Sequence, residues 1–141
     1  MPSIVPVHPQ PPKAEYNMPF LPAVAVQGGK LLFLSGCGPI PLYHKHPHVP
    51  EEERTWMSGG FRAQLDRTMA NIKSVLAASG GDLRSIVKLT VYVTDISKQN
   101  ELNEAVFEYF GRDAPPPRTL VEVSALSHQD MMIEIDATAV V

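Results

Sequence analysis

The sequence predicts an α+β fold in which a mixed β-sheet carries two helices packed on one face. Two patterns carry this prediction. Apolar residues recur in steps of three and four over residues 61–76, which is the spacing of an amphipathic helix. Over residues 87–94 apolar and polar residues alternate, which is the spacing of a half-buried strand. Because helical and strand segments alternate along the chain, crossover helices should cover one face of the sheet.

Length and composition limit the possible classes of protein. The chain has 141 residues, so we interpret residues 1–141 as a single domain. Its single cysteine cannot form an internal disulfide and suits a reducing compartment, so a cytoplasmic location is expected. Its apolar runs are too short for a membrane span. The net charge of −3 provides no basic surface for a phosphate backbone, so nucleic acid is not an expected partner.

The first part of the chain is rich in proline, with seven of the 14 prolines in residues 1–22. Proline fixes φ, so this segment is predicted to be an extended arm, and it lacks the pattern of a signal peptide. Residues 23–27 and 30–35 flank two glycines and are predicted to pair as a β-hairpin. The glycine-rich and proline-rich residues 36–60 are predicted to form a long irregular loop.

The second half of the chain predicts one more helix and two more strands. A helix is expected up to about Phe110, with Asp95 or Ser97 as its N-cap. Three prolines then end any helix, and residues 118–124 and 131–141 are typical of strands. The last strand has apolar residues on both sides, so the uncovered face of the sheet is expected to be a subunit interface.

Arg118 and Glu134 are the candidate residues for chemistry. Pro115–Pro117 restrict the backbone just before Arg118, and a guanidinium presents a planar fork that suits a carboxylate. Glu134 lies in the last predicted strand. Their spacing alone leaves open an ordinary strand-edge arginine paired with a surface acid.

Short segments spread over most of the chain occur in a characteristic order. They are FLSG at 33–36 with Pro39, Gln64 and Asn71 in the first helix, ASGGDL at 78–83, VKLTVYVTD at 87–95, Asn103, PRT at 117–119, VEV at 121–123 and IEI at 133–135. From about Phe20 to the C-terminus, this order resembles the RidA/YjgF family of enamine/imine deaminases.

The resemblance implies a chorismate-mutase-like fold, assembled as a homotrimer with clefts between subunits. It also implies hydrolysis of enamine and imine intermediates of amino acids to 2-oxo acids and ammonia, without metal or organic cofactor. By its position in the family motif, Arg118 would bind the carboxylate of a small-molecule substrate, and Glu134 would activate the attacking water. The other residues implied to contact the substrate are Asn103, Ser35, Gly36, Phe20 and Cys37.

Two positions depart from the family pattern. Phe20 stands where many members have a tyrosine, and a phenyl ring cannot donate the hydrogen bond of a hydroxyl. Leu120 stands where many members have a cysteine. Two alternatives to this function stay open: a deaminase of a larger unsaturated amino acid such as 2-aminomuconate, and a non-catalytic protein that binds a 2-oxo acid or an amino acid.

Residues 42–57 form an insertion relative to the common family form. The insertion holds three histidines at alternate positions, His44, His46 and His48. On an extended backbone these side chains would share one side and could offer nitrogens to a transition metal. Pro47 and Pro50 perturb such a backbone, so solvated histidines and no metal are expected. Alternatively, the insertion covers the cleft, where Tyr43 or Trp56 stacks on a larger substrate.

Overall fold

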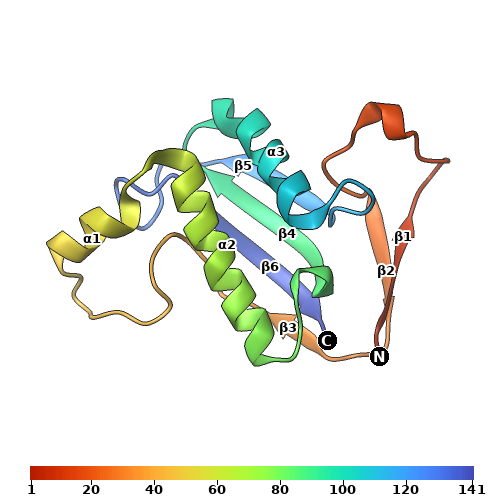
Figure 1. Cartoon of the computed structure of the whole chain (residues 1–141), viewed down its shortest axis with the longest axis horizontal. Coiled ribbons are helices and arrows are strands. Elements are labelled where there is room, and N and C mark those ends of the chain that lie inside the picture. The colour runs from red at the N-terminus through yellow and green to blue at the C-terminus, as the bar shows by residue number, and fades with distance from the viewer.

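The computed structural model describes residues 1–141, which form six β-strands and three α-helices (Figure 1). In chain order these are β1 (Ser3–Val7), β2 (Ala23–Gln27), β3 (Leu31–Phe33), α1 (Pro50–Met57), α2 (Gly60–Ala78), β4 (Ile86–Val93), α3 (Gln99–Phe110), β5 (Arg118–Glu122) and β6 (Ile133–Val140). The mixed α+β class is therefore confirmed, with three helices in place of the two that were predicted.

The main sheet has four strands in the order β3-β6-β4-β5. β4 and β5 are parallel, whereas β6 is antiparallel to both β3 and β4. β1 and β2 form a separate antiparallel ribbon, which lies to one side of the main sheet in Figure 1. None of the helices combines the length and hydropathy that a membrane-spanning helix requires.

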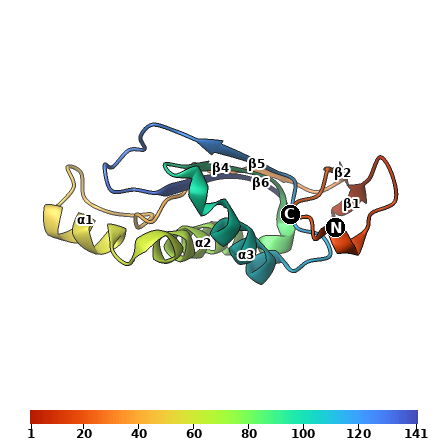
Figure 2. The same cartoon turned by 90° about the horizontal axis from the view of Figure 1, so that it is seen from above.

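All of the helices lie on one side of the main sheet, as Figure 2 shows. The core forms where α2 and α3 pack against that side. α2 contributes Phe61, Leu65, Met69, Ile72 and Leu76, α3 contributes Leu102, Ala105 and Val106, and β4 and β6 contribute Ile86, Leu89, Val91, Val93, Ile133, Ile135, Ala137 and Ala139. No helix covers the opposite side, which we call the open face.

The periodic segments form the elements that their spacing predicted. The helix expected over residues 61–76 is α2, and the strand expected over residues 87–94 is β4. Asp95 caps the 3-10 turn Ile96–Lys98 that leads into α3, because its carboxylate accepts a hydrogen bond from the Ser97 amide at 2.9 Å. The N-cap of α3 itself is Lys98, so the prediction that Asp95 or Ser97 caps this helix needs correction. Each of these segments buries one face only, so its sequence period matches its structure.

The predicted hairpin between residues 23–27 and 30–35 is wrong. β2 pairs with β1 and β3 pairs with β6, so the two segments belong to different sheets. Gly28 and Gly29 do have the positive φ values of a tight turn, 75° and 80°. At Gly29, however, a Cβ would come within 2.6 Å of Val140 Cγ1, so this glycine lets the chain pass close to the C-terminus.

Two further predictions need correction. The 36–60 segment is not irregular throughout, because α1 begins at Pro50. Proline suits the first turn of a helix, and the three glutamates that follow at 51–53 interact favourably with the helix dipole. The N-terminal arm is extended over β1, but it pairs with β2 and contains a 3-10 turn over Ala14–Tyr16.

Gln64 connects three parts of the chain from inside the core, where it is only 1% exposed. Its amide nitrogen donates to the carbonyl oxygens of Met57 and Asp130 at 3.0 and 2.9 Å. Its amide oxygen accepts from the Met132 amide at 2.7 Å. The side chain thus holds the end of α1 and the chain before β6 against α2.

We expect Gln64→Leu to lower the free energy of unfolding by about 2–4 kcal/mol, because an apolar side chain leaves three partly or fully buried backbone groups without partners. Urea denaturation measures the loss. The exposed Gln99→Leu serves as the matched control and should stay within about 0.5 kcal/mol of the wild type. A Gln64→Leu protein as stable as this control would contradict the connecting role of Gln64.

Candidate active site

The three prolines hold the start of β5 in place. Residues 115–117 are buried, and two of their carbonyl groups accept backbone hydrogen bonds from different parts of the chain. The Pro117 oxygen accepts from the Leu89 amide at 3.0 Å, and the Pro115 oxygen accepts from the Leu21 amide at 3.0 Å. These bonds fix the backbone of Arg118 next to β4 and bring the segment of Phe20 beside it.

Arg118 has an incomplete set of hydrogen-bond partners. Its Nη2 donates to Oδ1 of Asn103 on α3 at 2.8 Å, and its guanidinium lies 5.5 Å from the centre of the Phe20 ring. Its Nη1 is buried and has no partner. Burial lowers the pKa of Arg118 from its usual value. A cation with a free buried donor favours an anionic group with two oxygen atoms, such as a carboxylate.

Glu134 lies on β6 among the open-face residues. Gly36 lies directly beside it, and a Cβ added at Gly36 would collide with Oε1 of Glu134. The pKa of Glu134 is raised, first by burial and second by the negative charge of Asp136. A raised pKa makes Glu134 a stronger proton acceptor than an ordinary glutamate.

Asp136 and Tyr92 complete the surroundings of Glu134, and they were not among the predicted site residues. The Tyr92 hydroxyl donates to Oδ2 of Asp136 at 3.3 Å, and the nearby charge of Asp136 raises the pKa of Tyr92. The alternating pattern of β6 places Glu134 and Asp136 on one face, so the sequence did contain this signal.

Ser35 and Cys37 flank Gly36 on the segment that continues β3 along β6. Cys37 exchanges two backbone hydrogen bonds with Ile135, at 2.9 and 2.8 Å. Its side chain is 6% exposed and belongs to the core, and burial raises the pKa of its thiol. Its backbone pairing aligns Gly36 with Glu134, whereas its sulfur is directed into the core.

The predicted residues therefore form two groups. Arg118, Asn103 and Phe20 make one group, and Glu134 lies with the 35–37 segment in the other. Arg118 pairs with Leu89 of β4, which is buried beneath the helices, whereas Glu134 pairs with Tyr92.

Side chains at paired positions of a sheet share a face, and Leu89 and Tyr92 are directed to opposite faces of β4. Arg118 therefore extends toward the helix side and Glu134 extends from the open face. Their register also separates them by three residues, roughly 10 Å along β4. One chain does not bring these two side chains together.

Comparison with known proteins places the chain in a family. The model of the family described as Endoribonuclease L-PSP matches residues 13–141, so the chain belongs to that family. The proteins it is similar to include some named as RutC family proteins and one named RidA, which confirms the RidA/YjgF resemblance.

Three similar proteins illustrate the range of the family. Protein DfrA of Myxococcus xanthus is 43% identical over 122 residues, covering 86% of this chain and 85% of the relative. A relative from Escherichia coli, provisionally named reactive intermediate deaminase TdcF, is 29% identical over 120 residues, covering 82% and 84%. The structure of RidA from the Antarctic bacterium Psychrobacter sp. matches with a TM-score of 0.65 at 26% identity, covering 97% and 94%.

We expect Asp136→Asn to lower the pKa of Glu134 part of the way toward its usual value. Removing the neighbouring negative charge makes ionisation of Glu134 easier, while burial, the larger cause, keeps the pKa raised. A carbon-detected NMR titration of the Glu134 carboxyl group measures the change, with the exposed Asp113→Asn as control. An unchanged or higher pKa of Glu134 would show that Asp136 does not act on it.

Proposed function

We propose that this chain is a hydrolytic deaminase that converts enamine and imine intermediates of amino acids to 2-oxo acids and ammonia at clefts between subunits. The observation that carries the proposal is Arg118, whose buried Nη1 has no partner. An unpaired buried donor costs about 1–3 kcal/mol, and a substrate carboxylate that accepts from Nη1 and a second guanidinium nitrogen would offset this cost.

Asn103 and Phe20 support the role of Arg118 as the carboxylate anchor. Asn103 fixes one end of the guanidinium through its 2.8 Å hydrogen bond. Phe20 lies over the guanidinium and contributes a cation–π attraction without competing for its donors. The edge that carries Nη1 is then left for a ligand with two oxygens.

Glu134 supplies the proton transfers that hydrolysis needs. Protonation of an enamine carbon gives an iminium ion, and water then adds to the C=N carbon as Glu134 takes one proton from that water. The resulting carbinolamine receives that proton on nitrogen, and its C–N bond breaks to release ammonia. The hydroxyl group gives its proton to solvent as the carbonyl forms, which balances the proton first added to the enamine carbon. A positioned acid and base contribute about 10² to 10⁴-fold, which suits an already unstable substrate.

A second copy of the chain would supply the missing half of the site. Arg118 and Glu134 belong to opposite faces of the sheet, so one copy would contribute the anchor and its neighbour the base. The open face supports such an assembly, since Phe33 on it is 79% exposed and Leu31 beside it is 58% exposed. We propose a homotrimer with three equivalent clefts.

The family description also names an endoribonuclease. The charges of this chain favour a small carboxylate substrate instead. Its net charge is −3, and the open face carries the neighbouring acids Glu134 and Asp136. Negative groups of this kind repel a phosphate backbone, whose binding depends on lysine and arginine.

Tyr43 and Trp56 of the insertion are the residues that bear on whether the substrate is a small or a larger imine. Tyr43 is 94% exposed and is free to contact a ligand. Trp56 instead packs against histidine rings within the insertion, 5.3 Å from His44 and 5.5 Å from His48. Comparing 2-aminoacrylate, branched 2-imino acids and 2-aminomuconate in one ammonia-release assay identifies the preferred class.

We expect Arg118→Ala to lower kcat/KM for 2-aminoacrylate about 100-fold or more, because the substrate carboxylate loses a charged, two-pronged partner. The coupled ammonia-release assay measures the rate, and circular dichroism verifies the fold. The exposed Arg84→Ala is the matched control and should keep the wild-type rate. Wild-type turnover by folded Arg118→Ala protein would overturn the assignment.

The variant Glu134→Gln distinguishes a deaminase from a protein that only binds the same ligand. It should lose turnover about 10² to 10⁴-fold while binding a stable 2-oxo acid within a few-fold of wild type, because Arg118 remains intact. Calorimetry measures the binding, and the exposed Glu104→Gln is the control. Undiminished turnover, or equal losses of turnover and binding, would contradict a role for Glu134 in proton transfer.

A further inference from the structure

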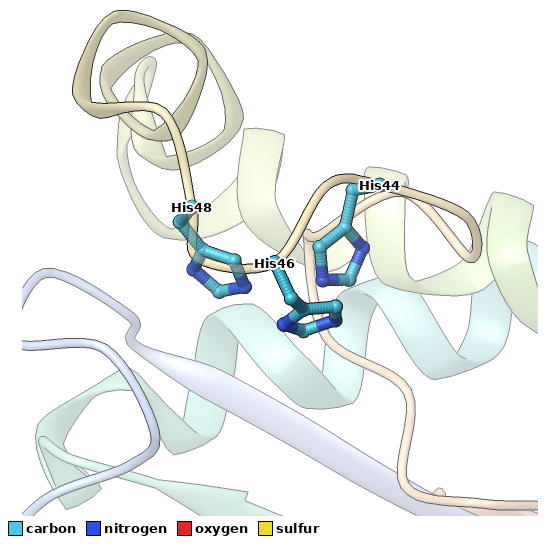
Figure 3. Close-up of side chains that lie close together, drawn as sticks. All are labelled: His44, His46 and His48. Carbon is cyan, nitrogen blue, oxygen red and sulfur yellow. The ribbon is translucent and has the colours of Figure 1, made fainter.

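Three imidazole rings gather within the insertion, and the proposed deaminase chemistry uses none of them. His44, His46 and His48 each offer a nitrogen, and these nitrogens all lie within 4.8 Å of one another. The ring centres are 4.5 to 5.1 Å apart. Figure 3 shows the three rings on the same side of the loop and turned toward one another.

A hydrogen bond at His44 and an ion-pair contact at His48 orient two of the rings for a shared ligand. Nδ1 of His44 lies 2.7 Å from the Pro41 carbonyl oxygen, which can only accept, so Nδ1 carries the hydrogen and Nε2 keeps its lone pair. Nδ1 of His48 lies 3.4 Å from Oε2 of Glu53, so the carboxylate faces this nitrogen and Nε2 of His48 is left for a ligand. Ring nitrogens held by a carbonyl or carboxylate are typical of metal-binding histidines.

The surroundings of the cluster are anchored to the rest of the chain. Oε2 of Glu53 also pairs with Nε2 of His128 at 2.8 Å, which connects α1 to the loop before β6. On the other side, Trp56 packs edge-on against His44 and His48. His48 and Glu53 are therefore held from two directions, whereas the exposed His46 is free to adjust.

We propose that His44, His46 and His48 form a binding site for a transition-metal dication of the zinc class. Imidazole nitrogen is a preferred ligand of such ions, and three protein ligands leave the fourth tetrahedral position for water. Zn–N bonds of about 2.0–2.1 Å place ligand nitrogens roughly 3.4 Å apart, so the rings need to close by no more than about 1.5 Å.

A bound ion would fix the insertion close in sequence to one half of the candidate active site. The insertion follows the segment that contains Gly36, and Asn71 of α2 holds the start of the connection through the carbonyl oxygens of Gly38 and Ile40, at 2.9 and 2.7 Å. The metal would hold the next part of the same loop against α1. Its role is structural and separate from the carbonyl chemistry at Glu134.

Titration of Zn²⁺ into the tag-free full-length protein tests the site. We expect one Zn²⁺ per chain by calorimetry and native mass spectrometry, and a change in fluorescence of Trp56, the only tryptophan. Co²⁺ should give the intense visible absorption of a tetrahedral site. None of these readouts depends on deaminase activity, so failure of the deaminase proposal leaves this test intact.

The variant His46→Ala should weaken Zn²⁺ binding at least about 10-fold and abolish the tetrahedral Co²⁺ spectrum, because one of the three ligands is lost. Since His46 is exposed, the variant should fold normally. His44→Ala is a second ligand variant with the same expected loss. The exposed His8→Ala is the matched control and should bind Zn²⁺ like wild type. Wild-type protein without 1:1 binding, or equal affinities of His46→Ala and His8→Ala, would overturn the site.

Discussion

The alternation of side chains across the four-stranded sheet is the constraint on which the candidate site depends. The core residues Ile133 and Ile135 flank Glu134 on β6, so Glu134 extends from the open face whenever they are buried. A slip of one residue would reverse every side chain of the strand and expose both isoleucines, at a cost of about 1.5–3 kcal/mol each. The separation of Glu134 from Arg118 is thus maintained by the same packing that stabilises the fold.

Arg118 shows how the fold holds a charged group that is partly buried. The Pro115 and Pro117 carbonyls hold its backbone, and Asn103 satisfies one end of the guanidinium. The Phe20 ring covers one face of the guanidinium, with a cation–π attraction that is worth about 0.5–2 kcal/mol. Because these contacts leave Nη1 without an acceptor, they define the charge of the group that would bind there.

The sequence predicted those parts of the structure that depend on local periodicity. The residues of α2 and β4 each bury one face, so their apolar spacing was sufficient. The pairing of β3 depends instead on the distant C-terminal strand, where Lys30 exchanges backbone hydrogen bonds with Val141. No local pattern could distinguish that pairing from a hairpin at Gly28-Gly29.

The site was predictable to a similar degree. Arg118, Glu134 and Asn103 could be named from motifs, whereas the free Nη1 of Arg118 depends on how α3 packs over β5. The separation of Arg118 and Glu134 across the sheet depends on the registers of both strands with β4, which motifs do not contain.

The insertion is the clearest case in which local and distant signals combine. Their alternate spacing indicated that three histidines could share one side of the loop. How closely they approach one another depends on the fold of the loop and on contacts from Glu53 and Trp56. The start of α1 could have been predicted from Pro50 and the three glutamates that follow it, which are typical of the first turn of a helix. The bond from Glu53 to His128 joins residues far apart in the chain, so it is visible only in the structure.

Subunit mixing tests most directly whether the site is shared between copies of the chain. Arg118→Ala and Glu134→Gln proteins would be co-assembled in equal amounts, with exchange verified by native mass spectrometry. In a homotrimer about one cleft in four then combines an intact Arg118 from one copy with an intact Glu134 from its neighbour. The mixture should recover about a quarter of the wild-type ammonia release, although each variant alone is inactive. Absence of recovery after verified exchange would contradict a site built from two copies.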